Sequence, residues 1–495
     1  MTTTRVRARY VIAWDGTSHR TLENGEVVYR GDSIIFVGRG YGGPVDAEID
    51  GGNAVLGPGF IDMNALADLD TTVLAFDNQP DWAKGRTWPE DYLSSGPIEM
   101  YSGEEQTFTK KYAFAQLIRN GITTALPITS MFYRKWAETY DEFARAADSA
   151  AELGLRAYLG PCYMTGVEVV RGDCSFYTHW DEERGLKGLA DAERYIRAYD
   201  GAHDGLIRGG LFPDRIENCT PKLLRRSAAI SAELGVPVKL HCAQSMDEFD
   251  ALVARYDMTP VEWLKSLDFL SSRALLPHGV FLTGHSRVQR KGDDVGLLRE
   301  SGATLVHCPL VGSRYGVTME SFARLRQAGI RIGLGTDTFP PDMVENMRIG
   351  ISLCRVTDHS VTAASAADFY DAATVDAADA LGRPDLGRLA VGVKADMTLF
   401  DLSDFAIGQV IDPIQTMVLS GTGRDFRTVI INGRVVMRDR QLPGVDLEEW
   451  NTRAQAQFDG LIAKYPMRTL HHPPVEQIFK PSYAELGEAA EVLGN

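Results

Sequence analysis

The sequence has 495 residues, 44% hydrophobic and 24% charged, which is the composition of a globular chain with room for one large domain and a smaller companion. Its formal net charge of −16 argues against nucleic acid as a partner, because phosphate binding needs clustered Lys and Arg, and the same charge would repel anionic membranes. No apolar run approaches the roughly 20 residues of a membrane-spanning helix, and no signal-like segment follows Met1, so we expect a cytoplasmic protein.

Both ends of the chain carry β-rich sequence. Short strand-like segments separated by turns fill residues 1–56, and a matching set occupies residues 381–445. A small group of strands cannot bury both of its faces alone. We therefore expect the two ends to form one composite β-sandwich domain, with a C-terminal helix and an extended tail over residues 446–495.

Between the two ends one pattern recurs, in which a helix ends in glycine and a β-branched strand follows at once. It occurs at Gly121, Gly154, Gly235, Gly302 and Gly329. Glycine suits the left-handed position after a helix, and helices that alternate with buried strands favour a parallel sheet. No Gly-x-Gly-x-x-Gly motif opens the first unit, so we predict an α/β fold with a (β/α)8 TIM-like barrel over residues 57–380.

A long irregular insertion, about Ala67 to Glu105, follows the first barrel strand. A loop of this length in a compact domain is usually functional or disordered. Its aromatic residues, among them Trp82 and Trp88, favour either a lid or a subunit contact rather than disorder. We expect these two tryptophans to contact a small-molecule substrate, and we expect a homodimer or higher homo-oligomer.

Residues capable of acid–base or metal chemistry follow several of the predicted strands. His241 ends the strand at 236–240, and Asp337 follows the strand at 331–336. His278 and His307 follow two strands between them. Because active sites of such barrels lie at the carboxyl ends of the strands, three imidazoles and a carboxylate at this face indicate a functional site.

The six cysteines are scattered without a Cys-x-x-Cys pair, which favours reduced thiols over a disulfide framework or a zinc knuckle. Cys162, Cys242 and Cys308 lie at or just beyond strand ends, where one could act as a nucleophile. We favour small buried residues instead, because a reactive thiol also needs a lowered pKa.

Segments along nearly the whole chain resemble the amidohydrolase superfamily, and most closely its branch of triazine hydrolases and of cytosine, guanine and adenosine-analogue deaminases. The segments are Pro58–Asp62, Leu234–His241, Pro277–Leu282, Val306–Pro309, Leu334–Asp337, Glu345–Arg348, Gly387–Asp396 and Val429–Arg434. The resemblance implies a barrel with a β-sandwich. It also implies hydrolysis of a C–N bond, as an amide, an amidine or a ring amino group, in a small cyclic or aromatic nitrogen compound.

The resemblance assigns roles to three residues. His241 and Asp337 correspond to ligands of a divalent metal, and Asp337 also corresponds to the group that handles the proton of the attacking water. His278 corresponds to the residue that polarises the substituent of the target carbon. We therefore expect His241, His278 and Asp337 to be catalytic.

The chain departs from the family pattern in its first strand and after its fifth. The family's first-strand His-x-His is replaced by Asn64 and Leu66, and Gln244 stands where deaminases often have a glutamate. Glutamine keeps hydrogen bonds but cannot transfer a proton at neutral pH. We expect these three residues to bind substrate, together with His307 and Arg314.

The loss of two ligands makes the metal uncertain. One weakly bound zinc or iron on His241, His278 and Asp337 is chemically permissible. We slightly favour a site with no cofactor. In it, Asp337 or His241 acts as general base on water, and Arg314 or a backbone N–H stabilises an oxyanion.

Two other functions stay open from the sequence. The same acid and base could serve a nonhydrolytic lyase or isomerase, and the barrel could be an inactive binding or scaffold homologue. Release of ammonia or of a ring-opened acid separates hydrolysis from both.

Overall fold

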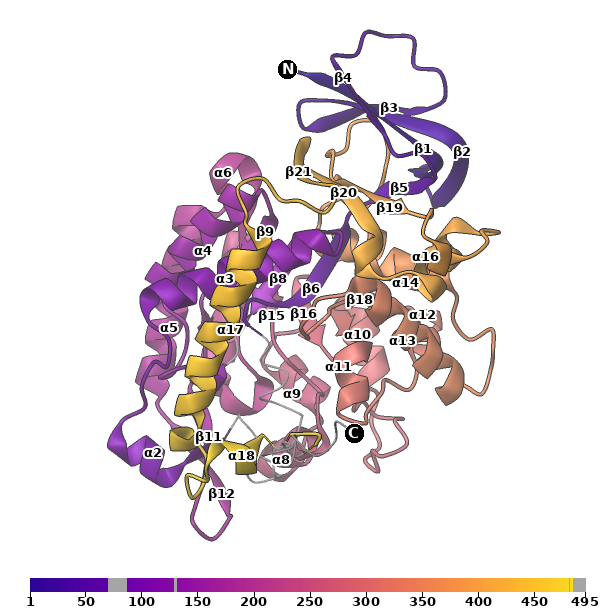
Figure 1. Ribbon diagram of the computed structural model, residues 1–495. Helices are drawn as coiled ribbons and strands as arrows, with labels where there is room; N and C mark the ends of the chain where they lie inside the picture. The colour runs from indigo at the N-terminus through magenta and orange to yellow at the C-terminus, as the bar shows by residue number, and fades with distance from the viewer. Residues whose placement is uncertain (70–86, 129–130, 480, 484–495) are drawn as a thin grey trace, which may run out of the picture.

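The computed structural model describes residues 1–69, 87–128, 131–479 and 481–483 (Figure 1). A β-rich domain lies at one end of a larger α/β barrel, and the strands of the barrel run away from it (Figure 1). The predicted fold class, a barrel with a β-sandwich from both chain ends, is confirmed. The domain boundaries at residues 56, 380 and 445 stay predictions.

One eight-stranded sheet joins the two ends of the chain, in the order β21-β20-β19-β5-β1-β2-β3 with β4 paired to β1. Its antiparallel pair β5–β19 aligns Leu56 with Leu399 and makes the connection. The strands are β1 (Thr3–Trp14), β2 (His19–Arg30), β3 (Ser33–Gly38), β4 (Ala47–Asp50), β5 (Ala54–Pro58), β19 (Met397–Asp401), β20 (Phe426–Ile431) and β21 (Arg434–Arg438).

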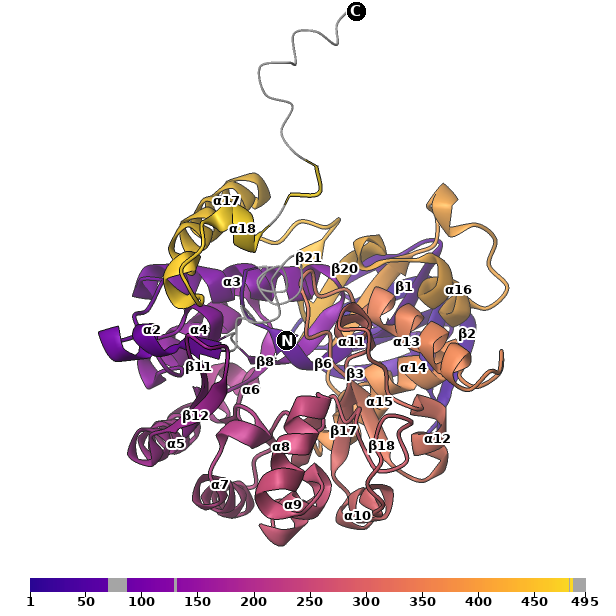
Figure 2. The same ribbon diagram turned by 90° about the horizontal axis from the view of Figure 1, so that it is seen from below.

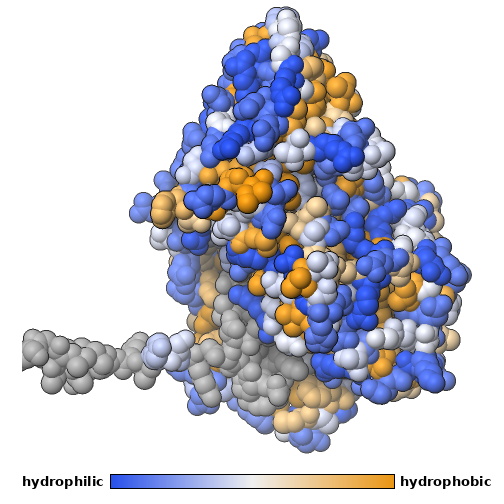
Figure 3. All heavy atoms as spheres, turned by 90° about the vertical axis from the view of Figure 1, so that its right-hand side faces the viewer, coloured by the Kyte–Doolittle hydropathy of each residue, from blue (hydrophilic) through white to orange (hydrophobic). Residues whose placement is uncertain are grey.

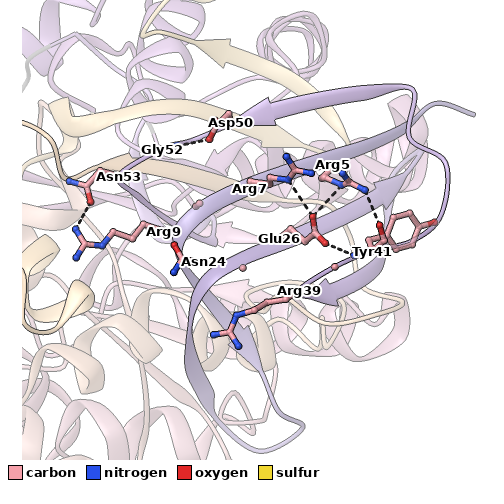
Figure 4. Close-up of a pocket in the computed structure, with 13 residues that line it drawn as sticks. Arg5, Arg7, Arg9, Asn24, Glu26, Arg39, Tyr41, Asp50, Gly52 and Asn53 are labelled. Carbon is pink, nitrogen blue, oxygen red and sulfur yellow. Dashed lines mark hydrogen bonds and ion pairs between the residues drawn. The ribbon is translucent and has the colours of Figure 1, made fainter.

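Side chains of β1 alternate between the two faces of this sheet. Val6 and Ala8 are buried, whereas Arg7 and Arg9 lie on the outer face. Figure 4 shows that face, where a hollow of about 600 Å³ is lined by arginines, carboxylates and Tyr41. The arginines are paired with neighbours, for example Arg5 with Glu26 at 3.2 Å. This hollow is therefore a solvated, charge-paired surface of the sheet, remote from the strand ends of the barrel.

Two four-stranded parallel sheets form the barrel wall. A bridge between Leu211 and Val238 joins them on one side. On the other side the Asp337 N–H donates to the Asn64 carbonyl at 2.8 Å. The strands are β6 (Phe60–Leu66), β8 (Ile122–Ile128), β9 (Arg156–Leu159), β13 (Ile207–Gly209), β15 (Val238–Lys239), β16 (Ala274–Pro277), β17 (Thr304–His307) and β18 (Arg331–Leu334).

Helices surround the strands as an outer ring (Figure 2). Thr139 and Thr220 each begin a helix by accepting an N–H of its first turn, and Gly154 and Gly235 end the same helices with φ of 80° and 67°, as the glycine pattern predicts. The helices of the barrel are α3 (Gly103–Arg119), α4 (Tyr140–Leu153), α5 (Glu182–Tyr199), α6 (Ala202–Gly205), α7 (Pro221–Leu234), α8 (Met246–Tyr256), α9 (Pro260–Ser266), α10 (Asp294–Ser301), α11 (Pro309–Arg314), α12 (Phe322–Gln327), α13 (Met343–Thr357), α14 (Ala366–Ala373) and α15 (Val375–Ala380). Near the β domain lies α16 (Pro413–Ser420).

The predicted insertion is more ordered at its end than expected. It contains β7 (Thr87–Pro89) and α2 (Glu90–Ser95), and α3 begins at Gly103 behind a capping box between Ser102 and Glu105. The prediction of an irregular loop as far as Glu105 is therefore wrong. Strand β7 pairs with β11 (Gly166–Val170), which pairs with β12 (Phe176–Trp180).

Trp88 lies in β7 with only 2% of its surface exposed. Its ring packs edge-on against Tyr92 at 5.6 Å and Trp136 at 6.1 Å between centroids. Met164 and Val169 belong to the same hydrophobic cluster. The structure thus places Trp88 in a local core that anchors the insertion. Trp82, the other predicted contact to substrate, lies outside the described residues.

The C-terminal segment packs back onto the barrel. The predicted helix is α17 (Leu447–Lys464), which lies along α3 (Figures 1 and 2). The expected extended tail is wrong for residues 466–478, because α18 (Val475–Ile478) follows and buries Ile478 in one cluster with Tyr465 and Leu69. His472 bonds through Nε2 to Asp91 Oδ2 at 2.6 Å, which ties the tail to α2.

The surface offers few large apolar areas on the face drawn in Figure 3, where hydrophobic residues form small groups among hydrophilic ones. No described helix combines the length and apolarity needed to cross a membrane. The predicted homo-oligomer stays a prediction.

Candidate active site

Four reactive side chains lie where β15, β16, β17 and β18 end. They are His241, His278, Cys308 and Asp337. Nε2 of His278 is 3.5 Å from Oδ2 of Asp337, and the rings of His241 and His278 are 5.4 Å apart between centroids. Potential ligand atoms of His278, Cys308 and Asp337 all lie within 4.8 Å of one another. The predicted trio of His241, His278 and Asp337 is thus brought to one mouth, but Cys308 takes the place of His241 in the tightest group.

His241 is held as a neutral imidazole with a defined tautomer. Its Nδ1 lies 2.7 Å from the carbonyl oxygen of Asp214, which can only accept, so Nδ1 carries the proton and Nε2 keeps its lone pair. Burial lowers the pKa of His241 to about 4, against the opposing effect of Asp214. Near neutral pH the Nε2 atom is therefore available to accept a proton or to bind a metal.

His278 and Asp337 adopt a backbone conformation that residues other than glycine rarely use, with φ of 76° and 43°. Hydrogen bonds hold both in place: the His278 N–H donates to the Val306 carbonyl at 2.9 Å, and the Asp337 N–H donates to Asn64. Such conformations cost about 1–3 kcal/mol and concentrate at functional sites. The fold therefore holds His278 and Asp337 in backbone conformations of higher free energy, which place the imidazole and the carboxylate next to each other.

Asn64 and Leu66 occupy the end of β6 beside β18. Asn64 is fully buried, its Nδ2 is 3.9 Å from Cys308 Sγ, and its Oδ1 has no hydrogen-bond partner among the described residues. A buried carbonyl left unsatisfied costs about 1–3 kcal/mol. Leu66 is also buried, at 7% exposure. The first-strand positions thus hold an amide turned toward the thiol and an apolar side chain.

His307 packs behind β17, because side chains along a strand alternate between its faces. Val306 and Cys308 belong to the cluster inside the barrel, whereas the His307 ring lies 6.0 Å from Phe322 and 6.3 Å from Phe369 in the helical layer. Burial lowers the pKa of His307 to about 3. The expectation of three imidazoles at the mouth is thus met by two, and the role of His307 in substrate binding stays a prediction.

A narrow cavity of about 20 Å³, enough for roughly one water molecule, lies beside this group. Gln244, His278, His307 and Cys308 are among the residues that line it. Arg314 lies at the end of α11 and donates from an Nη atom to Thr338 Oγ1 at 3.0 Å, one residue past Asp337. Gln244 thus borders the cavity and Arg314 lies close to Asp337, and their contact with substrate stays a prediction.

Three buried ionisable residues near the mouth were not foreseen. Lys239 lies two residues before His241 and donates to the Leu126 carbonyl at 2.7 Å, and burial lowers its pKa to about 8. Asp62 accepts from Thr336 Oγ1 at 2.5 Å, and burial raises its pKa. Burial likewise raises the pKa of Glu248 to about 8. Alternation along the extended segment Lys239-Leu240-His241 is the signal for Lys239, because residues two apart in such a segment point the same way.

Known proteins are similar in sequence to this chain over most of its length. The model of the family described as the amidohydrolase family matches residues 55–436. A 5'-deoxyadenosine deaminase of Methanosarcina barkeri is 26% identical over 470 residues, which cover 93% of this chain and 98% of that protein. A 5-methylthioadenosine/S-adenosylhomocysteine deaminase of Pelotomaculum thermopropionicum is 28% identical over 443 residues, which cover 87% and 93%.

Solved structures share the fold. An adenosine deaminase from Xanthomonas campestris with bound zinc has a TM-score of 0.75 at 20% identity, covering 92% of this chain and 98% of that one. Atrazine chlorohydrolase TrzN from Arthrobacter aurescens complexed with zinc has a TM-score of 0.74 at 21% identity, covering 92% and 99%.

The cofactor prediction needs correction. The slight preference for a site with no cofactor is wrong, because structures of this fold bind zinc and because the described residues bring three potential ligands together. The buried Asn64 Oδ1 beside them is an oxygen that a cation would satisfy, so the donor set fits a divalent metal.

The predicted enzyme class is confirmed, since the similar proteins are deaminases, which are hydrolases of C–N bonds other than peptide bonds. The reduced metal site stays a prediction. A family match across residues 55–436, on a barrel with its reactive groups at the strand ends, shows that the chain belongs to the amidohydrolase family.

Proposed function

We propose that this protein is a metal-dependent deaminase that hydrolyses the exocyclic C–N bond of an adenosine-like purine nucleoside. The names of the relatives support the substrate class, and a purine is a cyclic aromatic nitrogen compound. The observation that carries the proposal is the facing pair His278 and Asp337, 3.5 Å apart at the mouth of the barrel. A general acid and a general base at this distance can act on one small substrate group.

In the proposed reaction water adds to the ring carbon that bears the amino group, the C–N bond breaks, and ammonia leaves. A divalent metal held among His241, His278 and Asp337 would supply Lewis acidity that makes water nucleophilic at neutral pH. Asp337 accepts a proton from the attacking water, and His278 lies where it can donate toward the substrate. Gln244 cannot transfer a proton, so proton transfer rests on these residues and on His241.

The remaining predicted contacts have separate parts in substrate binding. Leu66 makes one side of the pocket apolar, which suits the face of an aromatic ring. Arg314 lies at the mouth, where it can reach the polar rim of a nucleoside. A cytoplasmic location and a homodimer or higher homo-oligomer belong to the same proposal. Light scattering on the purified chain measures the oligomeric state.

The test is release of ammonia by metal-loaded protein from 5'-deoxyadenosine and 5-methylthioadenosine, followed with the absorbance change of the purine ring. Asp337→Asn should lower kcat by about 100-fold or more, because it removes the general base while keeping the side-chain shape. Asp191→Asn on exposed α5 is the matched control and should leave kcat unchanged. The proposal is wrong if folded, metal-loaded protein releases no ammonia from either nucleoside, or if Asp337→Asn keeps full turnover.

A further inference from the structure

We propose that Cys308 is a thiolate ligand of the metal in this site, together with His278 and Asp337, and that Asn64 Oδ1 is a fourth, weaker ligand. The inference rests on the proposed function only in assuming that a metal binds at the barrel mouth. It replaces His241 as a ligand by a sulfur atom and so defines a different metal centre.

The first support is the geometry of three neighbouring strands. His278, Cys308 and Asp337 follow β16, β17 and β18, which pair in that order. Their potential ligand atoms lie within 4.8 Å of one another, a group that does not include His241. Zinc–ligand distances of about 2.0 to 2.3 Å place the ligand atoms of one tetrahedral site within about 4 Å of each other. Small side-chain adjustments therefore suffice to bring these three atoms around one ion.

The second support is independent and comes from β6. Asn64 is fully buried, yet its Oδ1 has no hydrogen-bond partner among the described residues. The same amide lies against Cys308, with Nδ2 3.9 Å from Sγ. Buried carbonyl oxygens are nearly always satisfied, and a cation beside Cys308 would satisfy this one. The residue that stands in place of a first-strand imidazole would thus still face a metal bound beside Cys308.

The ligand chemistry is consistent. One thiolate, one imidazole and one carboxylate are ordinary zinc ligands, and water can displace the weak Asn64 oxygen or add as a fifth ligand. Binding breaks the Cys308 S–H bond, forms a metal–sulfur bond and releases one proton to solvent. His241, with its Nε2 lone pair outside this group, is then free to act on the water or the substrate as a base.

Cobalt(II) titration of the metal-free protein is the test, because thiolate coordination gives a charge-transfer band in the near ultraviolet. Wild type should bind one cobalt per chain and show the band. Cys308→Ser should lose the band and bind at least tenfold more weakly, since even groups that only support a ligand contribute roughly 10- to 100-fold. Cys354→Ser, a change at another buried free cysteine, should behave as wild type. Asn64→Leu should keep the band and weaken binding.

A second measurement uses only the wild-type protein, so its result does not depend on whether a variant folds. X-ray absorption of the zinc-loaded wild type should show one sulfur at about 2.3 Å. Zinc surrounded by nitrogen and oxygen alone, a band that survives in Cys308→Ser, or no metal binding would each overturn the proposal. Full deaminase activity without a zinc–sulfur bond overturns the ligand and leaves the function standing. A zinc–sulfur bond without deaminase activity supports Cys308 as a ligand and overturns the proposed function.

Discussion

Lys239 places an amino group inside the barrel, below the mouth. Its Nζ donates a hydrogen bond to the Leu126 carbonyl at 2.7 Å and lies 5.1 Å from the centroid of the Phe212 ring. Burial lowers the pKa of Lys239 to about 8, although the carboxylates of Asp62 and Asp337 act in the opposite direction. The interior thus holds a cation that the surrounding acids compensate in part.

Lys239→Met should change how stability depends on pH. Between pH 8 and 10.5 the unfolded chain keeps the lysine proton while the folded chain loses it, so this residue makes the free energy of unfolding rise with pH in that window. The slope is at most about 1.4 kcal/mol per pH unit. Urea denaturation across the window should show the slope in wild type and its loss in Lys239→Met. Lys187→Met, at an exposed position, should keep it; an unchanged slope in Lys239→Met would contradict the assignment.

Residues at the mouth were predictable to different degrees. His241, His278 and Asp337 were found because polar residues directly after buried strands are unusual and the barrel brings strand ends together. Cys308 was passed over in favour of its neighbour His307, because the sequence does not state which of two adjacent residues faces the interior. That choice is fixed by the register of β17 with β16 and β18, which align Val306 with Pro277 and Gly333.

At the scale of elements, helices α3 and α4 are joined by a buried charge cluster. Glu142 of α4 pairs with Lys110 of α3 and with Arg134, whose Nη atoms lie 2.6 and 2.5 Å from its carboxylate. All three side chains are 1% exposed. The two cations lower the pKa of Glu142 to about 2 against the effect of burial. Removing one member would leave the others buried without compensation.

Glu142→Gln should therefore destabilise the protein by about 3–5 kcal/mol at neutral pH. The usual pKa of 4.5 is depressed in the folded state, so this contribution is present above pH 4.5 and is lost as pH falls toward 2. Denaturant titrations at pH 7 and pH 3 measure both effects. Glu152, which is exposed, joins the same two helices through half-buried Lys111, so Glu152→Gln should cost no more than about 1 kcal/mol. Equal losses in the two variants would show that burial does not matter here.

The elements themselves were predicted more reliably than their ends. Glycine after each helix and a short strand-like run after each glycine located strands β8, β9, β17 and β18, since both signals are local. The tail beyond α17 was misjudged because its order comes from distant partners. Ile478 is buried against residues such as Leu69 and Tyr101, which a local pattern does not reveal.

On the scale of the whole molecule, a buried ion pair links the barrel to the β domain. Arg156 of β9 donates from Nε and an Nη atom to both carboxylate oxygens of Asp396, at 2.8 and 3.0 Å. Asp396 also accepts the Asn432 N–H at 2.6 Å. Two-pronged pairs of this kind fix orientation as well as contributing energy. The two domains are therefore locked in one arrangement at this point.

Asp396→Asn should cost about 3–5 kcal/mol of stability, because it leaves Arg156 buried without its counter-charge. It should also raise protease cleavage between the two domains, since their contact is weakened. Thermal unfolding and limited proteolysis give the two readouts. Asp401→Asn, whose partner Arg427 is half exposed, is the control and should change both by little. A variant at Asp396 as stable as this control would contradict the role of the pair.

The pairing of Leu56 with Leu399 sets the order in which the protein can be completed as it is synthesised. Strand β5 leaves the ribosome early, but its partner β19 emerges only after every barrel strand. Until then β5 has an open edge, and such edges invite pairing with other chains. Closing so long a loop also slows folding. The β domain is therefore completed only when β19 pairs with β5, late in synthesis. A chain truncated before β19 would keep the β5 edge open and would be prone to aggregate.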